Sequence, residues 1–354
     1  MSYGYYYALY SLIFCGYLFC TTYKEFTKAI IILLFVLLVL FQTIKNPLVD
    51  DGITYFRIFN SVSDFFDFVS FGKEPAFSVI PALLKKLDIF NRYTVFAVFA
   101  VIGVGFKLRY FAEYSYLPIL SILIYFSFYY IELDCSGIRS GCACGIFLWA
   151  IQDIQAGNFK VFCTKIVLAT FFHMSILVAL PLYFMNTKKA NVNIYLFIFL
   201  IFVVLDGVNL NPINFVLPNL GSIDRISNYV TGTEANGDVF SPFTKLYFIY
   251  MFEVYYLLAR SEALLRFNSC AVIMVKLLYF GILILYVLGP VSYTMASRLS
   301  EIFTLLNCII LTYFVYINEN IFQKIIIRGL LIFYSGFSLY TVLSSGTLVA
   351  RHYF

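Results

Sequence analysis

The sequence predicts an all-α protein with helices that cross a membrane many times. Of its 354 residues, 62% are hydrophobic and only 12% are charged, whereas a soluble domain usually contains about 25% charged residues. The stretch from Ala29 to Phe41 carries no charge and could not be solvated by water. Because a spanning helix needs about 20 mostly apolar residues, the chain suffices for about ten or eleven helices, and for a few more if some are short.

The first two helices set the predicted orientation. Tyr3 to Cys20 is apolar and has no small-residue cleavage site after it, which favours a retained helix over a signal peptide. Lys24 and Lys28 follow, and short basic loops of membrane proteins lie in the cytoplasm. We therefore expect the N-terminus to lie outside and Ala29 to Ile44 to return across the membrane.

Two longer segments break the apolar pattern, and we expect both on the outer side. In residues 45–91, acidic and basic residues are interleaved with aromatic ones, a pattern typical of amphipathic helices that lie in the membrane interface. Residues 206–245 are rich in Asn, Gly, Pro and Ser, which indicates a long outer loop.

The rest of the chain supplies the remaining spans. Residues 161–185 exceed one span and contain His173 near the centre, so we expect two short helices that turn near this histidine. The other predicted spans are Tyr93–Phe106, Leu117–Ile131, Ile138–Ile154, Ile194–Leu205, Leu246–Leu258, Val272–Leu288, Ile302–Ile317 and Ile325–Leu343.

This assignment gives a consistent topology of about twelve crossings in a single membrane domain, residues 1–354, with both termini outside. The basic residues of the short loops then all lie on the side of Lys24. If residues 161–185 formed one tilted helix instead of two, the number of crossings would be odd and the two termini would lie on opposite sides. The residues placed beside Lys24 are Lys107, Arg109, Lys160, Lys188, Lys189, Arg260, Arg266, Lys324 and Arg328.

Composition and missing motifs exclude several classes of function. The net charge is only +5 without a basic cluster, so we expect no nucleic-acid partner. The eight cysteines act as small hydrophobes and no disulfide is expected; Cys142 and Cys144 have no further ligands nearby, so we expect no metal. No Gly-rich nucleotide motif or G-x-S-x-G occurs, which disfavours ATP-driven transport and triad hydrolysis. No filter-like loop suggests a channel.

Two arginines at the predicted outer face are candidate anion ligands, because ionisable groups at membrane depth are functional hypotheses by default. Arg139 opens a helix, and it either snorkels or pairs with Asp134, or it clamps a phosphate in bidentate fashion. Arg298 lies at the predicted outer end of another helix. It either pairs with Glu301, three residues later, or joins Arg139 in binding a pyrophosphate.

The other candidates are one histidine and the polar residues of the outer segments. His173 either hydrogen-bonds a neighbouring helix or acts as a general base, which an imidazole can do near neutral pH. Asp51, Tyr55 and Glu74 in the first outer segment either belong to a solvated loop or contribute to the site. In the second outer segment the candidates are Asp224, Arg225 and Tyr229.

Several blocks in fixed order carry a resemblance to a known family. They are Asp51-x-x-x-Tyr55, Glu74-Pro75-Ala76-Phe77, Gly137-Ile138-Arg139-Ser140 with Phe147–Ile151 and Gly157-Asn158, Phe171–Ser175 with Pro181–Phe184, and Ser297-Arg298. In this order and in its polar positions, the chain resembles the EpsG-like and Wzy-type family of bacterial polysaccharide polymerases. Two positions depart from the family pattern: Ser140 replaces a typical Gln, and Leu299 replaces the commoner aromatic residue.

The resemblance implies a GT-C-like membrane glycosyltransferase with about twelve transmembrane helices. Such proteins polymerise oligosaccharide repeat units linked to undecaprenyl pyrophosphate into O-antigen or related surface polysaccharide, at the outer face of the bacterial inner membrane. The implied partners are the lipid-linked substrate, membrane lipids, a chain-length regulator and a flippase. No cofactor is implied.

The resemblance also suggests roles for the candidate residues. Arg139 and Arg298 would bind the departing pyrophosphate, and His173, Asp51 or Glu74 would deprotonate the acceptor hydroxyl. The residues expected to hold the glycan are Tyr55, Arg225 and Tyr229.

Three alternatives stay open. A ligase that joins finished glycan to another acceptor shares the donor and the chemistry. A flippase for lipid-linked oligosaccharide would form no bond, but its expected related halves are not visible. An acyltransferase would need a His-rich or His-Asp pair, and the sequence near His173 offers no such neighbour.

Overall fold

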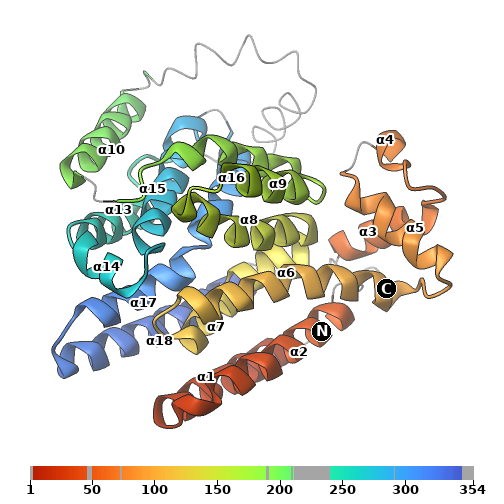
Figure 1. Ribbon diagram of the computed structural model, residues 1–354, viewed down its shortest axis with the longest axis horizontal. Helices are drawn as coiled ribbons and strands as arrows, with labels where there is room; N and C mark the ends of the chain where they lie inside the picture. Colours follow the sequence, from red (N-terminus) through yellow and green to blue (C-terminus); the bar gives the residue numbers. More distant parts are fainter. Residues whose placement is uncertain are drawn as a thin grey trace. The chain divides into compact units, whose positions relative to one another are not determined.

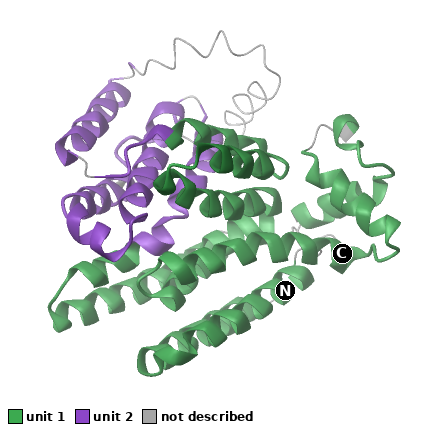
Figure 2. Cartoon of the chain, viewed as in Figure 1, with its two compact units in different colours: residues 1–183, 311–354 green, residues 184–310 purple. Residues whose placement is uncertain are grey.

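The computed structural model describes residues 3–45, 50–71, 74–188, 191–208, 210, 240–290 and 292–344, and these form helices joined by turns (Figure 1). No strand occurs in these ranges, and the all-α prediction is confirmed. The chain divides into two compact units, Met1–Tyr183 with Leu311–Phe354 and Phe184–Ile310 (Figure 2). The single membrane domain expected from the sequence stays a prediction.

The protein has the apolar helices of a membrane protein, but twelve crossings are not confirmed. Among the described residues, four helices are long and apolar enough to span: Lys24–Lys45, Arg92–Tyr114, Ala271–Leu288 and Ile321–Ser344. Two bent pairs raise the number to six if each forms one span: Pro118–Ser127 with Tyr130–Ser136 (67°), and Tyr293–Thr304 with Asn307–Ile317 (46°). Three more apolar helices, Met174–Phe184, Val192–Gly207 and Leu246–Leu258, are shorter than a full span.

The first unit contains most of the long helices. Its main elements are α1 (Gly4–Thr22), η1 (Lys24–Phe26), α2 (Thr27–Lys45), α6 (Arg92–Tyr114), α7 (Pro118–Ser127), the π-helix η3 (Tyr130–Ser136), α8 (Ile138–Ala156), α9 (Phe159–Thr170), the 3₁₀-helix η4 (Met174–Phe184) and α18 (Ile321–Ser344). Helix α6 packs between α2 and α8 and forms the centre of this unit. The chain breaks between α9 and η4, so the predicted turn near His173 is confirmed.

The described residues of the predicted first outer segment include three short helices, α3 (Asp50–Ser61), α4 (Phe68–Phe71) and α5 (Ala76–Lys86). Short helices agree with the amphipathic pattern of this segment, whereas its outer location stays a prediction. Phe59 of α3, Phe77 of α5 and Phe99 of α6 are fully buried, with ring centroids 4.9 to 6.0 Å apart. Aromatic burial of this kind fixes the segment against the start of α6. Asn91 starts α6 with a capping box that it forms with Thr94.

The second unit is built around α15 (Ala271–Leu288), most of whose residues are buried. Its other helices are α10 (Val192–Gly207), α13 (Lys245–Leu258), α14 (Ser261–Phe267), α16 (Tyr293–Thr304) and the start of α17 (Asn307–Ile317). Lys276 of α15 is buried, and its ammonium group donates hydrogen bonds to the carbonyl oxygens of Asn186 and, at 2.8 Å, Lys188.

A buried ion pair joins α6 to the π-helix in the first unit. The Nζ atom of Lys107 lies 2.7 and 2.8 Å from the two carboxylate oxygens of Asp134, and both side chains are at most 1% exposed. Lys107 also donates to the carbonyl of Gly141 at 2.7 Å, and the Tyr125 hydroxyl donates to Asp134 at 2.5 Å. All partners of this pair are therefore hydrogen-bonded, which a buried charge requires.

This pair corrects two expectations. Lys107 is not a loop cation beside Lys24, because α6 continues to Tyr114 and the lysine therefore lies about two turns inside the helix. Asp134 binds Lys107, so the suggested pairing of Asp134 with Arg139 is wrong.

A second buried pair ties α9 to α8. The Nζ atom of Lys165 lies 2.6 Å from a carboxylate oxygen of Asp153, with both side chains less than a tenth exposed. The same ammonium group lies 4.0 Å from the ring centroid of Trp149, a cation–π contact. Since α9 leads directly to the turn that contains His173, this pair helps to position that turn.

The glycine at position 141 is required by the close approach of α8 to the π-helix. A Cβ atom there would collide with the carbonyl oxygen of Leu133 and lie 2.8 Å from a carboxylate oxygen of Asp134. Gly141→Ala is expected to destabilise the protein by about 2 kcal/mol through overpacking. In the matched control, Gly329→Ala in α18, the added Cβ meets nothing within 4 Å, and we expect a gain of about 0.5 to 1 kcal/mol.

Thermal unfolding of the purified variants in detergent measures this difference. Equal unfolding temperatures for Gly141→Ala and Gly329→Ala would contradict the packing of α8 on the π-helix.

Lys107→Met is expected to destabilise the protein by about 3 to 5 kcal/mol, because it leaves the carboxylate of Asp134 buried without its cation. The double variant Lys107→Met, Asp134→Asn removes both charges and retains an acceptor for Tyr125, so we expect it to be more stable than the single variant. The unfolding temperatures of the two variants, and their yields of monodisperse protein, show which variant is the more stable. A double variant less stable than Lys107→Met would contradict the ion pair.

Candidate functional site

Five of the predicted site residues come from four different parts of the first unit. Asp51 and Tyr55 lie on α3, Glu74 comes just before α5, Arg139 lies in the first turn of α8, and His173 lies in the turn between α9 and η4. They are far apart in the sequence, but their side chains or those of their neighbours are in contact in the fold.

Glu74 contacts both Arg139 and His173, and we call these three residues the Glu74 cluster. One carboxylate oxygen of Glu74 accepts a hydrogen bond from Nη1 of Arg139 at 2.7 Å. The other lies 3.5 Å from Nδ1 of His173. Glu74 is only 6% exposed, whereas the side chains of Arg139 and His173 are 25% and 22% exposed. The cluster therefore has a buried anion and two groups that solvent or substrate can reach.

This geometry decides two readings that the sequence left open. Glu74 does not belong to a solvated loop, since it is buried against Arg139. His173 has no acidic neighbour in the sequence, but in the fold the distant residue Glu74 supplies a carboxylate beside it.

Backbone contacts hold the cluster together. The N–H of Ala76 donates to the carbonyl of Phe171 at 2.9 Å, and this bond ties the start of α5 to the turn before His173. The ring of Phe172 packs edge-on against Phe99 of α6, with centroids 6.1 Å apart. The positions of Glu74 and His173 thus follow from the packing of α5, α6 and the turn.

Aromatic rings support the guanidinium group of Arg139. Its central carbon lies 5.3 Å from the ring centroid of Phe77 and 6.0 Å from that of Tyr55. The two rings are themselves in edge-on contact at 5.2 Å. The guanidinium group of Arg139 is therefore hydrogen-bonded to Glu74 along one edge and lies beside two aromatic rings. Both contacts restrict its orientation.

Asp51 contacts the end of the π-helix, near the start of α8. Its carboxylate accepts a hydrogen bond from the Ser136 hydroxyl at 2.8 Å. Ser136 ends the π-helix three residues before Arg139, so Asp51 lies close to the start of α8. It is exposed, unlike Glu74.

The pKa of Glu74 is lowered to about 2. Burial alone would raise this pKa, but the contact with His173 and the charge and hydrogen bond of Arg139 outweigh burial. The carboxylate is therefore ionised at neutral pH. A group with such a low pKa accepts a proton poorly near pH 7, which favours Glu74 as a residue that orients its two neighbours.

Comparison with known proteins gives one match. The sequence model of the EpsG family matches residues 28–353, nearly the whole chain. The chain belongs to the EpsG family. This is a family of Wzy-like polymerases, in agreement with the resemblance carried by the ordered blocks. No curated protein and no solved structure matches the chain significantly.

The structure does not test the other predicted site residues of this EpsG-family protein. Arg298 lies on α16 in the second unit, and its part in the site stays a prediction. Arg225 and Tyr229 lie outside the described residues. In the part of the chain that the structure describes, no three His, Cys, Asp or Glu side chains gather as metal ligands would.

The cluster can perform acid–base chemistry beside an anion. A carboxylate at Nδ1 of an imidazole favours the tautomer in which Nε2 is free to accept a proton. The neighbouring guanidinium can stabilise negative charge that develops on a leaving group. Sequence reasoning found all three residues but missed their pairing, for which the only local signal was an acid followed by proline at Glu74-Pro75.

Glu74→Gln is expected to lower the free energy of unfolding by about 3 kcal/mol at neutral pH, because it removes the charge that Arg139 neutralises. The pKa of Glu74 in the folded protein is lower than the ordinary glutamate value of 4.5. The wild-type advantage is therefore fully present above about pH 5 and is lost as the pH falls from about 4.5 toward 2.

Unfolding temperatures of both proteins in detergent from about pH 3 to pH 7 test this dependence. The exposed Glu25 supplies the control, Glu25→Gln, which should match the wild type throughout. A constant gap between the wild type and Glu74→Gln across this range would argue against the lowered pKa.

Proposed function

We propose that this EpsG-family protein polymerises oligosaccharide repeat units carried on undecaprenyl pyrophosphate, at the outer face of the bacterial inner membrane. The growing glycan is transferred to the next lipid-linked unit, and pyrophosphate-linked lipid departs. The observation that carries the proposal is the Glu74 cluster, in which one buried carboxylate orients an imidazole and a guanidinium. Family membership supports a polysaccharide polymerase.

His173 is proposed as the general base for the acceptor hydroxyl. Its imidazole is partly exposed and has an ionised carboxylate beside it, which stabilises the imidazolium formed on proton uptake. Glu74 is the positioning residue for this base. Asp51 was the other candidate for the base, but its carboxylate is bound to Ser136, and we assign it to holding the start of α8.

Arg139 is proposed to bind the pyrophosphate together with Arg298. Arg139 is already paired with Glu74, so its charge alone does not offset a pyrophosphate, and a second cation is needed. Arg298 is the candidate that the sequence offers. Tyr55 beside Arg139, with Arg225 and Tyr229 from the second outer segment, is proposed to contact the glycan.

The alternatives differ in what they require. A ligase would use the same residues but transfer a finished glycan to a different acceptor, and a flippase would need no base. An acyltransferase gains some support from the His173–Glu74 contact but would need an acyl donor. A chain-length regulator and a flippase for the lipid-linked unit are the proposed partners of the polymerase.

The decisive assay supplies the purified protein with one lipid-pyrophosphate-linked repeat unit and no nucleotide sugar, and it follows the glycan on a gel. We expect a ladder of increasing length from the wild type. Addition of an acyl group, transfer of a finished chain alone, or no bond formation would each contradict the polymerase.

Arg139→Ala, assayed at an equal amount of folded protein, is expected to abolish the ladder, because the leaving pyrophosphate loses its cation. The variant should also be less stable than the wild type, because the buried carboxylate of Glu74 loses its guanidinium partner. His173→Gln should slow each transfer by about 10²- to 10⁴-fold, the usual contribution of a general base. The control is Arg109→Ala, which removes an exposed arginine from α6. A normal ladder from Arg139→Ala would refute its assignment, and unchanged chain growth in His173→Gln would reduce His173 to a structural contact.

A further inference from the structure

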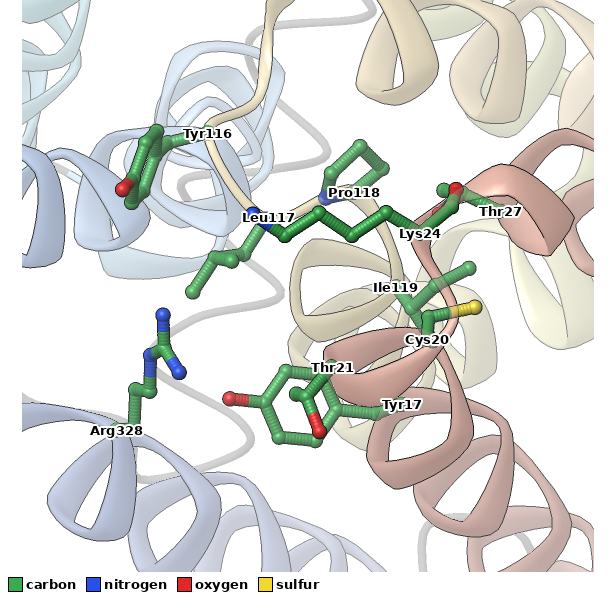
Figure 3. Close-up of a pocket in the computed structure, with 10 residues that line it drawn as sticks. All are labelled: Tyr17, Cys20, Thr21, Lys24, Thr27, Tyr116, Leu117, Pro118, Ile119 and Arg328. Atoms are coloured by element: carbon green, nitrogen blue, oxygen red, sulfur yellow. The ribbon is translucent and has the colours of Figure 1, made fainter. Parts of the chain in front are cut away.

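A cavity of about 230 Å³ lies in the first unit, apart from the residues of the Glu74 cluster. We call it the Lys24 cavity. The end of α1, the turn η1, the starts of α2 and α7, and α18 together form its walls (Figure 3). The polar side chains that matter here are Tyr17, Lys24 and Arg328.

The cavity is electropositive. Lys24 and Arg328 both line it, and neither forms an ion pair with a carboxylate of any described residue. The Nε atom of Arg328 is buried without a hydrogen-bond partner in the described structure. Buried polar atoms are normally satisfied, so an unpaired donor at a cavity indicates a missing acceptor.

A buried tyrosine faces the same space. Tyr17 is only 4% exposed, and its hydroxyl donates to no described residue. Figure 3 shows this hydroxyl and the guanidinium group of Arg328 turned toward each other. Together they present O–H and N–H donors to one ligand.

The start of α7 adds to the positive potential. Pro118 is the first residue of this ten-residue helix, and Pro118 and Ile119 line the cavity. The N-terminal end of a helix dipole attracts anions. Two cations, a hydroxyl and a helix start therefore converge without a compensating carboxylate from the described residues, which is suited to an anion with several acceptor oxygens.

Size and surroundings identify the anion more closely. Ligand pockets for drug-sized molecules measure about 300 to 1,000 Å³, so the cavity is too small for an oligosaccharide repeat unit but can hold a phosphate. The helices beside it expose apolar side chains, among them Phe19 of α1 and Ile325 of α18, which are 45% and 60% exposed. Tyrosines such as Tyr17 and Tyr116, which line the cavity, are typical of the membrane–water interface.

We propose that the Lys24 cavity binds the phosphate headgroup of an anionic phospholipid, with the acyl chains on the exposed apolar faces of α1 and α18. Basic pockets between membrane helices are suited to such headgroups. Lys24 and Arg328 are expected on the same side of the membrane from their loop positions, and their meeting at one cavity agrees with that expectation. The proposal is independent of the polymerase function.

The test uses the full chain in nanodiscs of phosphatidylcholine with increasing fractions of phosphatidylglycerol. The unfolding temperature and the number of lipids retained in native mass spectrometry are measured. We expect both to rise for the wild type, and Lys24→Gln and Arg328→Gln each to lower the apparent lipid affinity about five-fold, the effect of one cation near an anionic surface. Tyr17→Phe, which removes only the hydroxyl, should give a smaller loss in a protein with an unaltered fold.

Matched controls come from the same elements. Lys28→Gln on α2 and Lys324→Gln on α18 remove cations that do not line the cavity, and both should respond as the wild type does. An unaltered lipid response in the double variant Lys24→Gln, Arg328→Gln would overturn the proposal. A cavity-dependent shift with inorganic phosphate in pure phosphatidylcholine nanodiscs would assign the site to free phosphate and overturn the lipid as its source.

Discussion

Lys107 and Asp134 form an ion pair inside the first unit, and the geometry of the candidate site depends on it. Asp134 belongs to the π-helix that leads into α8, and Lys107 also holds the carbonyl of Gly141 on α8 itself. One ammonium group thus contacts the π-helix before Gly137 and α8 after it. Arg139 lies in the first turn of α8, so the direction in which its guanidinium group projects depends on an ion pair to which Arg139 itself does not belong.

The pair is costly to bury, and the surrounding sequence shows how the cost is met. Two ions at membrane depth are tolerated when every donor and acceptor is paired. Tyr125 supplies the remaining hydrogen bond to Asp134, and Gly103 and Gly141 leave room for the carboxylate, since a Cβ at either would approach it within 2.8 Å. The same two glycines let α6 and α8 pack closely, which is how small residues act between membrane helices.

The sequence predicted the parts of the fold that local pattern determines. Apolar composition gave the helical membrane class, alternating charge and aromatic residues gave the amphipathic segment, and excess length around His173 gave the break after α9. Partner choice was not predictable, because Glu74, Asp134 and Lys107 select their partners through tertiary packing across long stretches of chain. The count of twelve crossings treated residues 161–185 as two short spans and every other apolar run as one span. In the described residues, several of these runs instead form short or bent helices.

Two arginines of the first unit illustrate how partners, more than residue type, determine what a cation can do. Arg139 has a carboxylate at 2.7 Å and two aromatic rings beside it, so its position is fixed before any ligand arrives, although Glu74 offsets part of the positive potential around it. Such a group suits catalysis, where a preorganised cation stabilises negative charge that develops late. Arg328 has no carboxylate partner in the described residues, and its positive potential at the cavity is therefore not offset. It suits a resident anion, whose binding then completes the hydrogen bonds that the protein leaves open.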